Sequence, residues 1–152
     1  MAVRVPMIFL VLLLLPGCGG GRDARMSARE VSVAFHRASY EPGTNMHEVT
    51  VDYHPGTIHV ADAPFLTERA ITSASAIMDS LGRPAVSVTF GIEAAHEMGV
   101  NSEALIGKPM AIYVDGVLVA APVVKSRFTS TAIISGSFTD KEVSRIVGSL
   151  QD

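Results

Sequence analysis

The chain has 152 residues, of which 48% are hydrophobic and 18% charged, and its formal net charge is −3. This length can bury one modest hydrophobic core, so we expect a single globular domain. The small negative charge argues against nucleic acid as a partner, and the single cysteine excludes an internal disulfide and a cysteine-based zinc site.

The chain begins with the features of an export signal. Arg4 precedes Ile8 to Leu15, an uninterrupted apolar run. The run is too short to span a bilayer as a mature helix, but it has the length of a signal-peptide core. The next residues, Leu15-Pro16-Gly17-Cys18, resemble a bacterial lipobox, in which an aliphatic residue and a small residue precede the lipid-bearing cysteine.

We therefore expect residues 1–17 to be a lipoprotein signal peptide and Cys18 to carry the lipid. The mature protein would then be attached to a membrane on its extracytoplasmic side. The proline before Gly17 is unusual for a lipobox. An ordinary secretory signal with an incidental cysteine is the alternative.

A glycine-rich, polar segment follows Cys18, and its lack of periodicity predicts a flexible tether over residues 18–30. Residues 31–56 are expected to be an N-terminal extension with two strands. In the first strand, Val31, Val33 and Phe35 alternate with more polar residues, which places them on one face. Val49 to Tyr53 predicts the second strand.

The main domain is expected over residues 57–152. Its predicted elements, in order, are a strand at 57–60, a helix at 70–81, a strand at 85–90, a helix at 93–105, a hairpin at 108–124, a strand at 132–135 and a final helix after Thr139. This order predicts the α+β class, with a mixed sheet and helices packed on one face.

The predicted hairpin turns at Asp115-Gly116, a pair that favours the positive φ values of a two-residue turn. Its second arm is apolar on both faces, which predicts a central strand. Pro122 cannot donate a ladder hydrogen bond and should end that strand.

Two helices have specific signals. In the 70–81 segment, apolar residues recur at spacings of three and four, and Gly82 with Pro84 would end the helix. In the last helix, Thr139 and Glu142 have the spacing of a capping box.

The sequence shows no pattern typical of a catalytic or metal site. The five histidines are scattered, with no HExxH spacing, and neither a Gly-x-Ser-x-Gly elbow nor a Ser-x-x-Lys motif occurs. We therefore predict no enzymatic activity, no cofactor and no metal. The alternative is a small envelope hydrolase whose site is assembled from dispersed His, Asp and Ser residues, centred on His54 or His59.

Short motifs follow one another in a distinctive order: Leu66-Thr67-Glu68, Gly82-Arg83-Pro84-Ala85-Val86-Ser87-Val88, Ile106-Gly107-Lys108, Ala111-Ile112, Asp115-Gly116, Ala121-Pro122, Ile134-Ser135-Gly136 and Phe138-Thr139 with Glu142. With this order, the chain from about Ile58 to Leu150 resembles the head subdomain of the first extracytoplasmic domain of SecD, a translocase accessory protein. The resemblance implies an α+β head fold and a link to protein export. Ser137 and Ser130-Thr131 depart from the glycines common in that family, which leaves open whether a polypeptide-contact loop is inherited.

SecD itself is a multi-spanning protein, whereas the only long apolar run of this chain is its signal segment. We therefore expect a non-catalytic, lipid-anchored envelope protein that binds a polypeptide or protein partner, such as a translocase subunit or an exported polypeptide. The candidate contact residues lie in the loop after the hairpin, residues 122–131, which combines apolar and cationic groups: Pro122, Lys125, Arg127 and Phe128. Lys108 would extend this basic patch. A purely structural envelope lipoprotein is the remaining alternative.

Overall fold

The computed structural model describes residues 30–52 and 55–151. The predicted signal peptide, Cys18 and His54 lie outside the described residues. The described elements are β1 (Val33–Ser39), β2 (Met46–Thr50), β3 (Thr57–Ala61), β4 (Leu66–Thr67), the 3₁₀ turn η1 (Glu68–Ala70), β5 (Ile71–Met78), β6 (Pro84–Phe90), α1 (Ile92–Ala104), β7 (Met110–Val114), β8 (Val117–Ala120), β9 (Thr131–Ser135) and α2 (Asp140–Leu150).

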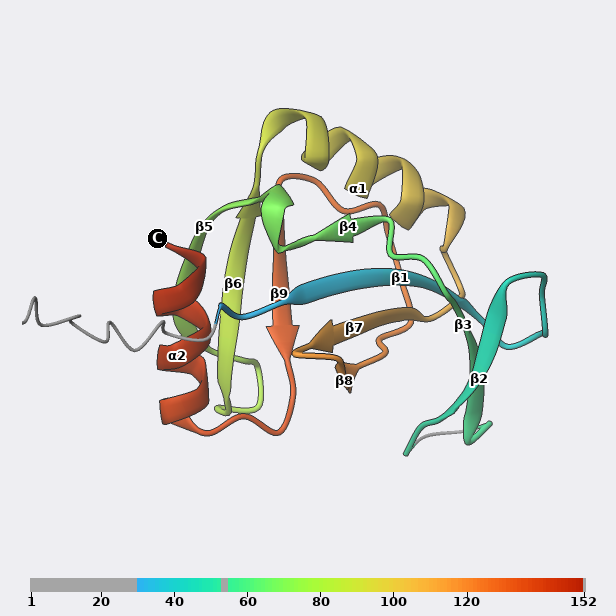
Figure 1. Ribbon diagram of the computed structural model, residues 1–152, viewed down its shortest axis with the longest axis horizontal. Helices are drawn as coiled ribbons and strands as arrows, with labels where there is room; N and C mark the ends of the chain where they lie inside the picture. Colours follow the sequence, from blue (N-terminus) through green and yellow to red (C-terminus); the bar gives the residue numbers. More distant parts are fainter. Residues whose placement is uncertain (1–29, 53–54, 152) are drawn as a thin grey trace, which may run out of the picture.

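The strands form two sheets. The larger has the order β2-β3-β1-β7-β8, with β4 also paired to β1, and the smaller has the order β5-β6-β9. β1 crosses the molecule lengthwise, with the small sheet and α2 at one end and the β2–β3 hairpin at the other (Figure 1). Strands from the predicted N-terminal extension are therefore integral to the larger sheet.

The predicted α+β class is confirmed, but the strand pairing differs from the predicted mixed sheet. Every pairing among the described strands is antiparallel. The main cause is that short loops join β2 to β3, β5 to β6 and β7 to β8, and such connections force neighbouring strands to run in opposite directions.

One main core joins the two sheets and both helices. Phe35 of β1 is fully buried and meets Phe90 of β6 edge-on, with 5.6 Å between ring centroids. Met98 of α1 and Ile146 of α2 close the same core. A second, smaller cluster on the opposite face of the larger sheet includes Ala38, Ile58, Val60, Ala111 and Ala121.

The predicted helix at 70–81 is wrong, because this segment forms β5 and pairs along its length with β6. Its apolar spacing of three and four is deceptive, since a register shift between Ile71 and Ser73 breaks the regular alternation. Gly82, read as a helix end, has a φ of 72° and lies in the loop of the β5–β6 hairpin. Asp79 holds that loop by accepting hydrogen bonds from the Leu81 and Arg83 backbone N–H groups.

β7 and β8 pair around the Asp115-Gly116 turn, whose two residues have φ values of 51° and 77°. The prediction that the second arm is a central strand is wrong, because β8 is the last strand of its sheet. Its apolar side chains are only partly covered, and Val117 is 63% exposed. Asp115 also accepts a 2.8 Å hydrogen bond from Arg145, which ties the turn to α2.

The capping box predicted for the last helix is confirmed. The Thr139 backbone N–H donates to Glu142 Oε2 at 2.8 Å, and the Glu142 N–H donates to Thr139 Oγ1 at 3.3 Å. The first of these bonds is the main reason that the pKa of Glu142 lies below its ordinary value of 4.5. The cap fixes where α2 begins, and thereby the position of Val143 and Ile146 in the core.

This pKa shift predicts a pH-dependent contribution of Glu142 to stability. A carboxylate whose pKa is lowered on folding stabilises the protein above its unfolded pKa, and this contribution is lost as the pH falls through the folded pKa. We expect Glu142→Gln to melt at a lower temperature than the wild type at pH 7, and the difference to shrink below about pH 4.5. Thermal melts of both proteins from pH 7 to pH 3 measure it. A difference independent of pH would contradict the assignment.

Candidate functional site

The predicted contact residues lie in the loop between β8 and β9, residues 122–131, which passes beside α1 (Figure 1). Pro122, Lys125 and Arg127 are exposed, whereas Phe128 is partly buried and packs against the main core. The loop therefore presents cations outward while an aromatic ring anchors it.

A hydrogen bond to a buried serine attaches this loop to α1. The Phe128 backbone N–H donates to Ser102 Oγ at 2.8 Å, and the Ser102 hydroxyl in turn donates within the helix to the Gly99 carbonyl at 3.1 Å. Gly99 also leaves room for the Arg127 side chain, because a Cβ at this position would lie 2.8 Å from Arg127 Nε. Gly99 is therefore the point at which the loop comes closest to α1.

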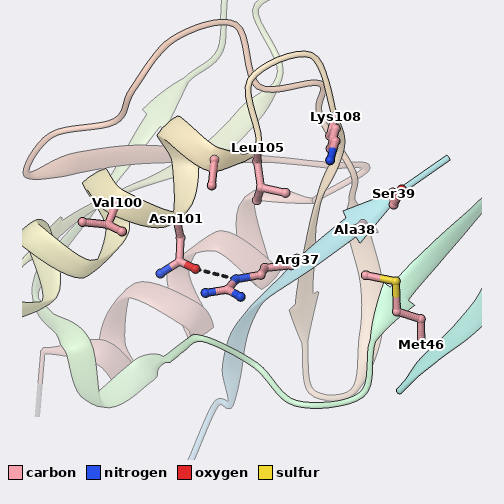
Figure 2. A pocket seen from close by; sticks show the side chains of 9 residues that line it. Arg37, Ala38, Ser39, Met46, Val100, Asn101, Leu105 and Lys108 are labelled. Atoms are coloured by element: carbon pink, nitrogen blue, oxygen red, sulfur yellow. Dashed lines mark hydrogen bonds between the residues drawn. The ribbon is translucent and has the colours of Figure 1, made fainter. Parts of the chain in front are cut away.

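A cavity of about 250 Å³ lies between the second half of α1 and the adjoining ends of β1 and β2 (Figure 2). Its polar lining includes Arg37 and Lys108, and its apolar lining includes Met46, Val100 and Leu105. Lys108 belongs to the basic set singled out from the sequence, whereas Lys125 and Arg127 do not line the cavity.

Arg37 and Asn101 were not singled out from the sequence, yet they form the polar centre of this cavity. Arg37 Nε donates to Asn101 Oδ1 at 2.6 Å, and the Asn101 amide donates to the Glu97 carbonyl at 2.9 Å (Figure 2). Asn101 is only 4% exposed, so both ends of its amide are held inside the fold. The available sequence signal was a cation two residues after Phe35 in the alternation of β1, at a position that is exposed in the structure.

The arrangement of the His, Ser and acidic side chains gives little support to the hydrolase alternative. The strand register sets Ser39 and Glu48 opposite His59 on its two neighbouring strands, so the three share one face of the sheet. However, Ser39 Oγ accepts from the Glu41 N–H at 3.1 Å, and no hydrogen bond joins the three side chains. A nucleophile and its base need such a bond. Among residues 30–52 and 55–151, no three His, Cys, Asp or Glu side chains gather as a metal site.

A family model described as the SecDF P1 head subdomain matches residues 44–152. The chain is 39% identical to the protein translocase subunit SecD of Aquifex aeolicus over 83 residues, which are 55% of this chain and 17% of that protein. It is 28% identical to SecD of Rhodobacter capsulatus over 142 residues, 87% of this chain and 26% of that protein. It is 38% identical to SecDF of Thermus thermophilus over 84 residues, 55% of this chain and 11% of that protein.

Solved structures agree on the fold. A structure of SecDF, described as a membrane component that enhances protein export, has a TM-score of 0.65 and 23% identity, covering 92% of this chain and 70% of that one. A SecDF structure in a super-membrane-facing form has a TM-score of 0.63 and 24% identity, covering 82% of this chain and 19% of that one. The chain thus spans about a quarter or less of the curated relatives it matches. Neither helix in the described part of the chain is long and apolar enough to cross a membrane.

Proposed function

Because this chain belongs to the SecDF P1 head subdomain family, we propose that it is a non-catalytic, lipid-anchored envelope protein that binds a polypeptide or protein partner during protein export. The observation that carries the proposal is the family match over residues 44–152. The link to export comes from the names of the relatives, which are protein translocase subunits. The binding role comes from the surfaces of this chain.

Two kinds of surface support binding. The 122–131 loop and the neighbouring cavity place Arg127 and Lys108 near exposed apolar side chains of α1 and its C-terminal end, where Val100 is 50% and Ile106 51% exposed. The sheets also end in strands paired on one side only, such as β5, and an extended polypeptide can add to such an edge. These contact patches favour a binding role over the purely structural alternative.

The folded part of the chain begins beside α2, and this position is compatible with a domain tethered through its N-terminal segment. The Val31 N–H donates to Ser149 Oγ of α2 at 2.8 Å, which fixes the start of β1 against α2. Arg37 and Ser39, which line the cavity, belong to the C-terminal part of β1. This end of the strand points away from α2 (Figure 1). A lipid at Cys18 would attach the domain to the membrane through the predicted flexible tether of residues 18–30, which would leave the loop and the cavity free to reach a partner.

Mass and crosslinking measurements on the native protein test this proposal. We expect the wild type to carry a lipid-sized mass increment and to partition into membranes, and Cys18→Ala to lose both, because the lipid provides the anchor. We also expect a photo-crosslinker at Arg127 or Lys108 to join the protein to translocase subunits or to polypeptide in transit.

The matched control is the same crosslinker at Lys141, which is exposed on α2 away from the cavity and the loop. Crosslinks of equal yield and identity at all three positions would indicate non-specific proximity and contradict the binding role. An unmodified, membrane-free wild-type protein would remove the anchor from the proposal.

A further inference from the structure

We infer that the cavity between α1, β1 and β2 binds an acidic side chain of an extended polypeptide. Its carboxylate would contact Arg37 and Lys108, and the flanking aliphatic groups would pack on the apolar wall. This inference rests on the proposed function, because it specifies which polypeptide segments the domain prefers.

The Arg37 side chain is exposed and is restrained by one hydrogen bond, in which its Nε donates to Asn101 Oδ1 at 2.6 Å. Its two terminal nitrogens have no hydrogen-bond partner among residues 30–52 and 55–151. A guanidinium in this state is prepared to bind a carboxylate through two parallel N–H···O bonds.

The lining of the cavity is positively charged. Lys108 adds a second cation beside Arg37, and no acidic side chain lines the cavity. The four ion pairs among the described residues involve neither Arg37 nor Lys108. Glu48 lies on the same face of β2 as Met46, but it neither lines the cavity nor pairs with these cations. The two positive charges are therefore available to an anionic ligand.

The size and the lining of the cavity suit side chains of a polypeptide. At about 250 Å³ it is smaller than the 300–1,000 Å³ typical of sites for drug-sized ligands, so it suits one or two side chains. Met46, Val100 and Leu105 supply an apolar wall beside the cations. An acidic residue flanked by aliphatic residues matches both halves of this lining.

A lipid phosphate would also attract the two cations. In a bilayer, however, that phosphate is surrounded by other polar headgroups, which do not match the apolar wall of Met46, Val100 and Leu105. An acidic residue between aliphatic residues matches both the cations and the apolar wall, which favours a polypeptide over a membrane lipid.

The test compares two labelled peptides in fluorescence anisotropy with the purified full chain. One has a Leu-Glu-Leu centre and the other Leu-Gln-Leu, and both have blocked termini so that the glutamate is the only carboxylate. We expect the glutamate peptide to bind about tenfold more tightly, as is typical for a charge-assisted hydrogen-bonded contact. Lys108→Gln and Arg37→Gln should each remove most of this preference, while Lys141→Gln should retain it.

Lys108→Gln is the decisive variant, because the hydrogen bonds of Lys108 within the fold use its backbone alone. Arg37→Gln also loses the contact to Asn101, so Arg37→Lys, which keeps the charge, accompanies it. Equal binding of the two peptides by the wild type would overturn the carboxylate site but leave polypeptide binding intact. Binding of neither peptide would also overturn this site, whereas the export role is decided separately by the crosslinking. The protein could instead bind phosphatidylglycerol vesicles in a Lys108-dependent way without discriminating between the two peptides. This result would overturn the carboxylate site and indicate a lipid-binding site.

Discussion

Replacing Phe35 with alanine is expected to lower the free energy of unfolding by about 3–5 kcal/mol. Phe35 is fully buried on β1, the strand that pairs with β3, β4 and β7. Its ring contacts Phe65 as well as Phe90, with centroids 6.5 Å and 5.6 Å away. The truncation leaves a cavity where the two sheets meet, and the surrounding strands are too constrained by their ladders to fill it. Since a domain is typically stable by about 5–15 kcal/mol, this is a large share.

Urea unfolding measures the effect, with two variants for comparison. Phe35→Leu should cost clearly less, because most of the apolar volume remains. Val117→Ala should change stability by less than about 0.5 kcal/mol, since this side chain is 63% exposed. Equal losses for Phe35→Ala and Val117→Ala would mean that β1 does not organise the core. Arg37 lies two residues beyond Phe35, so a displaced β1 would also weaken the peptide binding that we propose for the cavity.

Local sequence pattern correctly predicted those elements whose pattern fits only one type of secondary structure. The alternation of Val31, Val33 and Phe35 predicted the buried face of β1, and the Thr139–Glu142 spacing predicted the start of α2. The error at β5 arose because apolar residues three apart fit both a helix and a strand with an irregular register. Its Ile and Thr content and the loop at Asp79 favour a strand, but only the pairing with β6 decides between the two.

The cavity could not have been predicted from local pattern, because its parts are distant in sequence. Arg37 and Asn101 are 64 residues apart, and no short motif encodes their contact. Lys108 was identified as a surface cation, but its proximity to Arg37 follows from the β1–β7 register, in which Arg37 is opposite Met110. The 122–131 loop was identified by composition, whereas its attachment to Ser102 required the tertiary structure.

The attachment of that loop leads to the second large effect. We expect Ser102→Ala to lower the free energy of unfolding by about 1–3 kcal/mol, because it leaves the Phe128 N–H without its acceptor. Ser102 is fully buried, so water cannot readily replace the lost oxygen. Alanine has a higher helix propensity than serine, which offsets the loss by at most about 0.7 kcal/mol. The unsatisfied N–H is therefore the larger effect.

Ser144→Ala is a matched control, since Ser144 also lies in a helix and donates to a carbonyl of the preceding turn, that of Asp140, at 2.8 Å. It is exposed and has no partner in another segment among the described residues, so we expect little change in stability. Amide hydrogen exchange distinguishes the two variants further. Phe128 should exchange faster in Ser102→Ala alone, because the loop is then released from α1. Unchanged protection of Phe128 would show that its side chain in the core, rather than the Ser102 hydroxyl, holds the loop in place.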